Sequence, residues 1–169
     1  MTMSRSAIFS EDGKYRYSLT RIWDRDRPRL RWIMLNPSIA NDSRDSATIT
    51  RVIQYSEDLG FGSCVVYNLF ALVSQNPSKL ISHPDPVGTH NDRYLKQCLI
   101  NAKDDGNPVM VAWGNRARAR RLLDLQPLFL RFRDAGVRFC CLGITQQMQP
   151  MHPLGLNSDS EPFMVEWTW

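Results

Sequence analysis

Four short apolar runs constrain the fold of this chain more than any other feature. They cover residues 32–35, 64–68, 109–114 and 139–142, and segments with helical spacing of apolar residues separate them. An apolar run without polar alternation is typical of a strand that is buried on both faces, as in a parallel sheet under helices. The pattern predicts an α/β fold with three layers, α/β/α, around a mainly parallel four-stranded sheet.

The segments between these runs predict the helical layers. Apolar residues recur near helical spacing over residues 48–59 and lie on one side of a predicted helix over 92–102. Residues 116–123 are basic and helix-prone, and residues 128–135 predict another short helix. Gly60 follows the first segment and is typical of a helix end. Pro127 lacks a backbone N–H, so it is expected to end the helical stretch that begins at residues 116–123 and to separate it from the helix over 128–135.

The first thirty residues predict an additional β element. Residues 15–23 alternate aromatic or aliphatic with polar side chains, which is typical of a half-buried strand at a sheet edge or in a hairpin with the next strand. Basic residues gather on or near this segment, where they either follow a phosphate backbone or form a solvated face. They are Arg16, Arg21, Arg25, Arg27, Arg29 and Arg31.

Composition sets the remaining bounds. With 169 residues, of which 43% are hydrophobic, the chain is expected to form one domain over residues 1–169, with a core over about 15–167. A formal net charge of +4 suits a polyanionic partner. Neither a membrane span nor a secretory leader is expected, and four cysteines without a CxxC pair favour free thiols in the cytoplasm. Three scattered histidines and the absence of nucleotide-binding motifs predict no metal and no cofactor.

Three polar side chains follow the predicted strands. Asn36 and Asn68 stand at the ends of two strands, and His152 lies in the loop after the fourth. Because carboxyl ends of parallel strands meet at one edge, these side chains are expected to lie close together. Amides match the edge of a planar heterocycle, and an imidazole can donate to an oxygen that gains negative charge. The alternative for Asn36 and Ser38 is a turn, and for His152 a structural role.

A basic segment follows the third predicted strand. Arg116, Arg118 and Arg120 lie just beyond its carboxyl end, and with Ser38 they are the predicted contacts to a nucleic-acid backbone. An ordinary exposed helix explains the same arginines equally well.

Short motifs along the chain resemble those of known families. Residues 35–38, 65–68, 111–114 and 152–154 resemble, in order and approximate spacing, the motifs of the uracil-DNA glycosylase superfamily. More closely, the signature Met-Leu-Asn-Pro-Ser, Asn-Leu-Phe-Ala-Leu, Ala-Trp-Gly and His-Pro-Leu resembles a bacterial and phage domain family of unknown function. That resemblance covers residues from about 15 to 167.

The superfamily resemblance implies a glycosylase-like fold and a role for each matching residue. It implies that Asn36 orients the hydrolytic water, that Asn68 binds an extruded base and that His152 stabilises the departing base anion. Pro153 and Leu154 would approach the DNA.

Two more residues complete the predicted base-binding set. Leu35 precedes Asn36, and Phe70 is a candidate to stack on the base, as are Trp32 and Tyr67. The alternative for each of these three aromatic residues, and the one that their apolar surroundings favour, is core packing.

The expected function is therefore an N-glycosidase, a hydrolase that acts on a damaged or modified base in nucleic acid, or on a nucleotide. DNA is favoured over RNA as the nucleic acid, but the sequence does not decide between them. The first alternative is a non-catalytic module that binds nucleic acid or a modified base. The second is a hydrolase or transferase of free nucleosides or nucleotides. The sequence does not indicate the oligomeric state.

Overall fold

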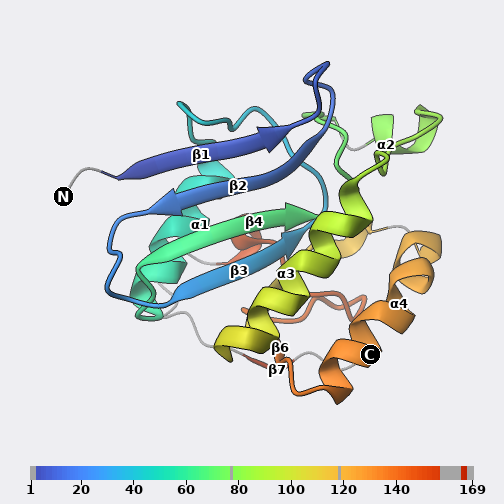
Figure 1. The fold of residues 1–169 in the computed structure, drawn as a ribbon. Helices are drawn as coiled ribbons and strands as arrows, with labels where there is room; N and C mark the ends of the chain where they lie inside the picture. Colours follow the sequence, from blue (N-terminus) through green and yellow to red (C-terminus); the bar gives the residue numbers. More distant parts are fainter. Residues whose placement is uncertain (1–2, 77, 118, 157–164, 167–169) are drawn as a thin grey trace.

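A mixed sheet with helices on both faces forms the protein (Figure 1). The computed structural model describes residues 3–76, 78–117, 119–156 and 165–166. Within these residues the sheet has seven strands, in the spatial order β1 (Ser4–Phe9), β2 (Arg16–Ile22), β4 (Ser63–Asn68), β3 (Arg29–Met34), β5 (Val109–Ala112), β6 (Phe139–Cys141) and β7 (Val165–Glu166).

The four predicted strands form the centre of this sheet. β4, β3, β5 and β6 pair in parallel, whereas β1 and β2 on one side and β7 on the other pair antiparallel. The predicted α/β class is confirmed. The predicted four-stranded, mainly parallel sheet is not, because three antiparallel pairings widen it into a mixed sheet.

The N-terminal strand does not lie where its alternation suggested. β2 is inside the sheet, between β1 and β4, and its hairpin partner is β1 rather than β3. β3 cannot form that hairpin because β4 and β5 occupy both of its sides. β1 was not predicted, since most of its side chains are exposed and it lacks a buried alternating face.

Helices cover the two faces of the sheet. α1 (Ala47–Asp58) packs on one face, and α3 (Asn91–Asp105) and α4 (Ala119–Asp134) pack on the other, in front of the sheet in Figure 1. A single short turn, α2 (Lys79–Ser82), lies in the long connection before α3. Each face has its own apolar core: Trp32 and Val52 belong to the α1 side, Leu95 and Phe129 to the α3 and α4 side.

Local chemistry explains the helix ends. The Ser46 hydroxyl accepts from the backbone N–H of Ile49 at 3.3 Å and caps α1. α3 ends at Gly106, whose φ of 70° is left-handed and therefore favours glycine.

The predicted break at Pro127 does not occur. α4 runs through this residue as one helix. Leu125 and Phe129, on either side of the proline, are both buried in the core, so packing holds the two halves together despite the missing N–H. Among the described residues, no helix is both long and apolar enough to cross a membrane.

Candidate functional site

A pocket opens at the carboxyl ends of the central parallel strands. Its volume of about 380 Å³ is at the lower end of the range for small-molecule sites, roughly 300–1,000 Å³. Asn36, Asn68 and His152 all line it, so the three side chains predicted from the sequence meet at one site. The parallel register explains this arrangement of the two amides, because Asn68 pairs with Met34, two residues before Asn36.

The Asn36 amide has a fixed orientation. Its Nδ2 donates to the backbone oxygens of Pro37 at 3.0 Å and Ser74 at 2.9 Å, with a third acceptor, Leu72, at 3.5 Å. An amide nitrogen that faces carbonyl oxygens leaves its Oδ1 as the acceptor for another group. The side chain therefore ties the β3 loop to the segment after β4, and it offers an oxygen as its remaining acceptor.

Asn68 is the last residue of β4 and lies almost completely inside the protein. Its side-chain Oδ1 is buried and accepts no hydrogen bond from the described residues. Leaving a buried acceptor unpaired costs roughly 1–3 kcal/mol. A ligand N–H in the pocket would remove this cost.

His152 enters the pocket from the loop after β6. Its Nδ1 accepts from the backbone N–H of Leu154 at 3.2 Å, at the start of a 3₁₀ turn (Pro153–Gly155). Burial lowers the pKa of the imidazole below its ordinary value of 6.5. The neutral ring must then carry its proton on Nε2, which makes Nε2–H the group available to a ligand.

Gly114 forms a left-handed turn next to this loop. Its φ of 68° is left-handed, its N–H donates to the Pro150 oxygen at 2.9 Å, and an added Cβ would lie 3.6 Å from the Cβ of His152. A substitution here would strain the turn that positions the histidine.

Arg16 also lines the pocket, and it was not among the predicted site residues. It is the first residue of β2, and β2 runs antiparallel to β4, so the start of β2 lies at the same sheet edge as the end of β4. A register shift in β2, with Ser18 and Arg16 opposite consecutive residues of β1, leaves Tyr17 as the extra residue. The sequence holds no local signal for this placement, because it depends on the antiparallel pairing of β2 with β4 and on the extra residue in β2.

The register shift decides which face Arg16 occupies. Tyr17 stacks on Tyr94 of α3, whereas Arg16 Nη1 donates to the Ala40 oxygen at 2.6 Å, in the loop before α1. With strict alternation, Arg16 would lie on the face opposite to Leu19. The extra residue instead brings Arg16 to the α1 side of the sheet, where Leu19 packs.

The charge of Arg16 has no counter-charge among the described residues. The residue is only 2% exposed, and its Nε is buried without an acceptor among the described residues. Burial, helped by the nearby charge of Arg21, lowers its pKa from 12.5 to about 10. The described lining of the pocket contains no aspartate or glutamate.

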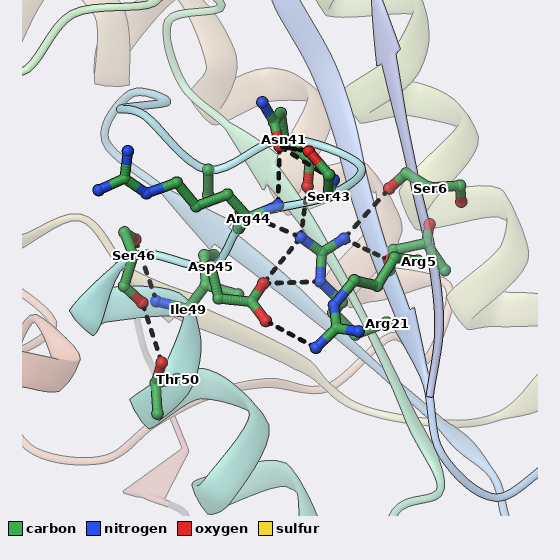
Figure 2. Close-up of polar contacts among 12 residues, drawn as sticks. Arg5, Ser6, Arg21, Asn41, Ser43, Arg44, Asp45, Ser46, Ile49 and Thr50 are labelled. Atoms are coloured by element: carbon green, nitrogen blue, oxygen red, sulfur yellow. Dashed lines mark hydrogen bonds and ion pairs between the residues drawn. The ribbon is translucent and has the colours of Figure 1, made fainter. Parts of the chain in front are cut away.

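A second arginine of β2, Arg21, anchors the loop that follows the pocket residues Ser38 and Ala40. Figure 2 shows Arg21 on β2 beneath the loop that leads into α1. Its Nε donates to Asp45 Oδ1 at 2.7 Å, and its Nη2 donates to the Asn41 oxygen. The same carboxylate accepts from Arg5 at 3.5 Å. This network fixes residues 41–45, which follow the pocket residues Ser38 and Ala40.

The structure brings some other predicted residues to the pocket. Leu35, Ser38 and Arg116 line it, with Arg116 in an exposed position. Arg120 does not: it is exposed and pairs with Asp124 at 3.0 Å. Arg118 lies outside the described residues.

Two further predicted residues lie away from the pocket. Phe70 is buried in the core on the α3 and α4 side, and Pro153 is buried beside His152; neither lines the pocket. Phe70 could not be placed from the sequence because the apolar run after Asn68 has no periodicity.

Among the described lining residues, Trp113 supplies the large aromatic side chain, and the three candidates named from the sequence do not line the pocket. Its Nε1 donates to Gln149 Oε1 at 3.0 Å, which joins the end of β5 to the loop that carries His152. Trp32, Tyr67 and Phe70 are core residues.

The arginines of the N-terminal segment divide into two groups. Arg16, Arg21 and Arg31 are buried. Arg25, Arg27 and Arg29 are exposed and line a second depression, of about 210 Å³, at the start of β3. A strand rises about 3.3 Å per residue, so β3 separates this depression from Asn36 by roughly 20 Å. The predicted basic face is therefore not continuous with the pocket.

Comparisons with known proteins assign the chain to a family but do not assign an activity. No curated protein and no solved structure matches the chain significantly, so the glycosylase-like fold has no support from a solved structure. In the described part of the chain, no group of three or more His, Cys, Asp or Glu residues could hold a metal ion. The expected membership of a family of unknown function is confirmed. The family model described as "Protein of unknown function (DUF1643)" matches residues 16–154, and the chain belongs to this family.

Proposed function

We propose that the protein binds a nucleobase in the pocket and hydrolyses its N-glycosidic bond, in DNA or in a nucleotide. The observation that carries the proposal is the meeting of Asn36, Asn68 and His152 around one pocket at the carboxyl ends of the parallel strands. Ligands of open α/β sheets bind at such ends.

The reaction needs groups of the kind that line the pocket. When water attacks C1′, its oxygen forms the new bond to carbon, and the C1′–N bond breaks with its electron pair passing to the base. A water proton ends on the base or in solvent. The sugar gains positive character and the base gains negative charge, so oriented dipoles lower the barrier.

Each side chain has a defined part in this reaction. Asn36 Oδ1 accepts from the water and orients it, because the Nδ2 is held by backbone oxygens. Asn68 Oδ1 accepts from an N–H of the base. The Nε2–H of neutral His152 donates to a base oxygen as its negative charge grows.

One observation favours a second candidate, a base-binding module without hydrolysis. The described lining contains no carboxylate, and a neutral amide such as Asn36 cannot take up a proton from the water. Binding without turnover requires only the recognition groups. The alternative of a hydrolase or transferase of free nucleosides or nucleotides is separated by the choice of substrate in the test below.

The test compares base release from oligonucleotides that carry uracil, hypoxanthine or hydroxymethyluracil with release from the matching free nucleosides and nucleotides. Chromatography detects the free base, and alkali cleaves the abasic strand. We expect Asn36→Ala and His152→Ala to lower the rate by about 100-fold or more, a typical loss for a positioned catalytic group.

Two control variants match these changes. His83→Ala removes a histidine whose Nδ1 also accepts from a backbone N–H two residues ahead, that of Asp85 at 3.1 Å, but which lies outside the pocket. Asn101→Ala removes a surface amide of α3 that pairs with Gln97. Base release that persists in the pocket variants contradicts the assignment, and base binding without release by the wild-type protein favours the second candidate.

A further inference from the structure

Arg16 differs from every other buried arginine of the described chain. Arg21 pairs with Asp45, Arg31 with Asp105 at 2.6 Å, and Arg121 with Asp92. Arg16, equally buried, makes no ion pair within the described residues and donates only to the neutral Ala40 oxygen.

A buried charge without a partner lowers the stability of the folded protein. In a pocket, a bound group of opposite charge can recover this free energy, which then contributes to binding. An arginine cannot escape by losing its proton at neutral pH, since even the lowered pKa of about 10 leaves it charged. Arg21 lies close enough to lower the pKa of Arg16 further, although Arg21 itself pairs with Asp45. A negative group in the pocket would relieve both effects.

The buried groups of the pocket also define the chemistry of the ligand. Among the described residues, neither the Nε–H donor of Arg16 nor the Oδ1 acceptor of Asn68 has a hydrogen-bond partner. Both residues are 2% exposed, whereas Asn115 and Arg116 are exposed lining residues, so the unpaired pair lies at the deep end. A heterocycle with a negatively charged acceptor and an N–H group satisfies both atoms.

We propose that Arg16 forms an anion-binding subsite at the deep end of the pocket, and that the pocket binds a heterocyclic base in negatively charged form. The charge can belong to a deprotonated ring nitrogen or to a carboxylate on the ring. The inference rests on the proposed function in one respect, that a base enters the pocket, and it does not depend on hydrolysis.

Calorimetric titration of the full chain with three free pyrimidines tests this subsite. Uracil is neutral, 5-nitrouracil loses a ring proton near neutral pH, and orotate carries a carboxylate. Hypoxanthine and the more acidic xanthine form the corresponding purine pair. At pH 8 we expect at least one anionic probe to bind about tenfold more tightly than its neutral relative.

The pH dependence separates the two sources of charge. Preference for a ring anion fades when 5-nitrouracil or xanthine is protonated at lower pH, whereas preference for a carboxylate persists. In Arg16→Met, we expect the preference for the anionic probe to disappear. Arg133→Met is the matched control, because Arg133 is an exposed residue of α4 outside the pocket.

Urea denaturation shows whether each variant is folded. Arg16→Met is expected to remain folded, since it replaces an unpaired buried charge with an apolar chain of similar length. Arg16→Lys, which keeps a charge but loses the Nε donor, is a second variant and should retain part of the preference.

Three results would overturn the inference: equal binding of neutral and anionic probes, an anion preference that survives in folded Arg16→Met, or no binding of any probe at millimolar concentration. Its failure is distinct from failure of the proposed function. Charge-selective binding without N-glycosidic hydrolysis contradicts the hydrolase alone, and hydrolysis without charge selection contradicts the Arg16 subsite alone.

Discussion

The side-chain nitrogen of Asn91 donates to the backbone oxygen of Asn68 at 2.9 Å, and thereby joins the first residue of α3 to the last residue of β4. It also donates to the Leu69 oxygen at 3.1 Å, which accepts from Arg121 Nε as well. Asn91 is thus a positioning residue for Asn68, although it does not line the pocket.

Asn91→Ala is expected to lower the free energy of unfolding by about 1–3 kcal/mol, because the backbone oxygen of Asn68 loses the hydrogen bond from the Asn91 side chain. Urea denaturation measures this loss, and Asn101→Ala on the outer surface of α3 is the control. A change no larger than that of the control would show that the contact does not hold the end of β4.

Arg21→Met is expected to lower the free energy of unfolding by about 3–5 kcal/mol, because it leaves the half-buried Asp45 carboxylate without its main partner. The variant also loses the contacts that hold the loop before α1. The surface pair of Arg133 with Asp134 is the comparison, and Arg133→Met should change stability by less than about 1 kcal/mol. Urea denaturation measures both unfolding free energies, and equal losses in the two variants would contradict the role given to Arg21.

Protonation of His152 is expected to destabilise the folded protein. Burial lowers its pKa in the fold, so the unfolded chain binds more protons and stability falls as pH drops below about 6.5. Protonation also removes the Nδ1 acceptor of the Leu154 N–H. Melting temperatures between pH 8 and pH 5 should therefore decrease more in the wild type than in His152→Gln. Parallel curves would show that this histidine is not responsible.

Pro127→Ala is expected to stabilise the protein by about 1–3 kcal/mol. The proline lies in the interior of α4 on an exposed side, where it removes a helical hydrogen bond without contributing to the core. Denaturant titration gives the sign directly. A loss of stability would mean that the proline restricts the unfolded chain more than it disturbs the helix.

The central strands and the meeting of three polar residues could be predicted because both follow from short-range patterns. An apolar run that ends in asparagine indicates a buried strand and its end, and parallel strands bring their ends together. The shared location of Asn36, Asn68 and His152 could therefore be predicted without knowing the other strands of the sheet. Their chemical roles stay predictions.

The placement of Arg16 depends on features that periodicity does not contain. Its approach to the pocket needs both the antiparallel position of β2 and the extra residue at Tyr17, and neither leaves a local signal in the sequence. The continuous helix through Pro127 is of the same kind, since buried residues on both sides of the proline override a local preference.

The unpaired charge of Arg16 links the stability of the whole chain to the contents of its pocket. The other buried arginines are neutralised by carboxylates of the chain, so their contribution to folding is complete before any ligand arrives. Arg16 has no such partner among the described residues, so any compound that supplies a counter-charge in the pocket is expected to raise the folded population by mass action. A thermal-shift screen of small anionic metabolites therefore searches for the natural ligand without assuming any reaction.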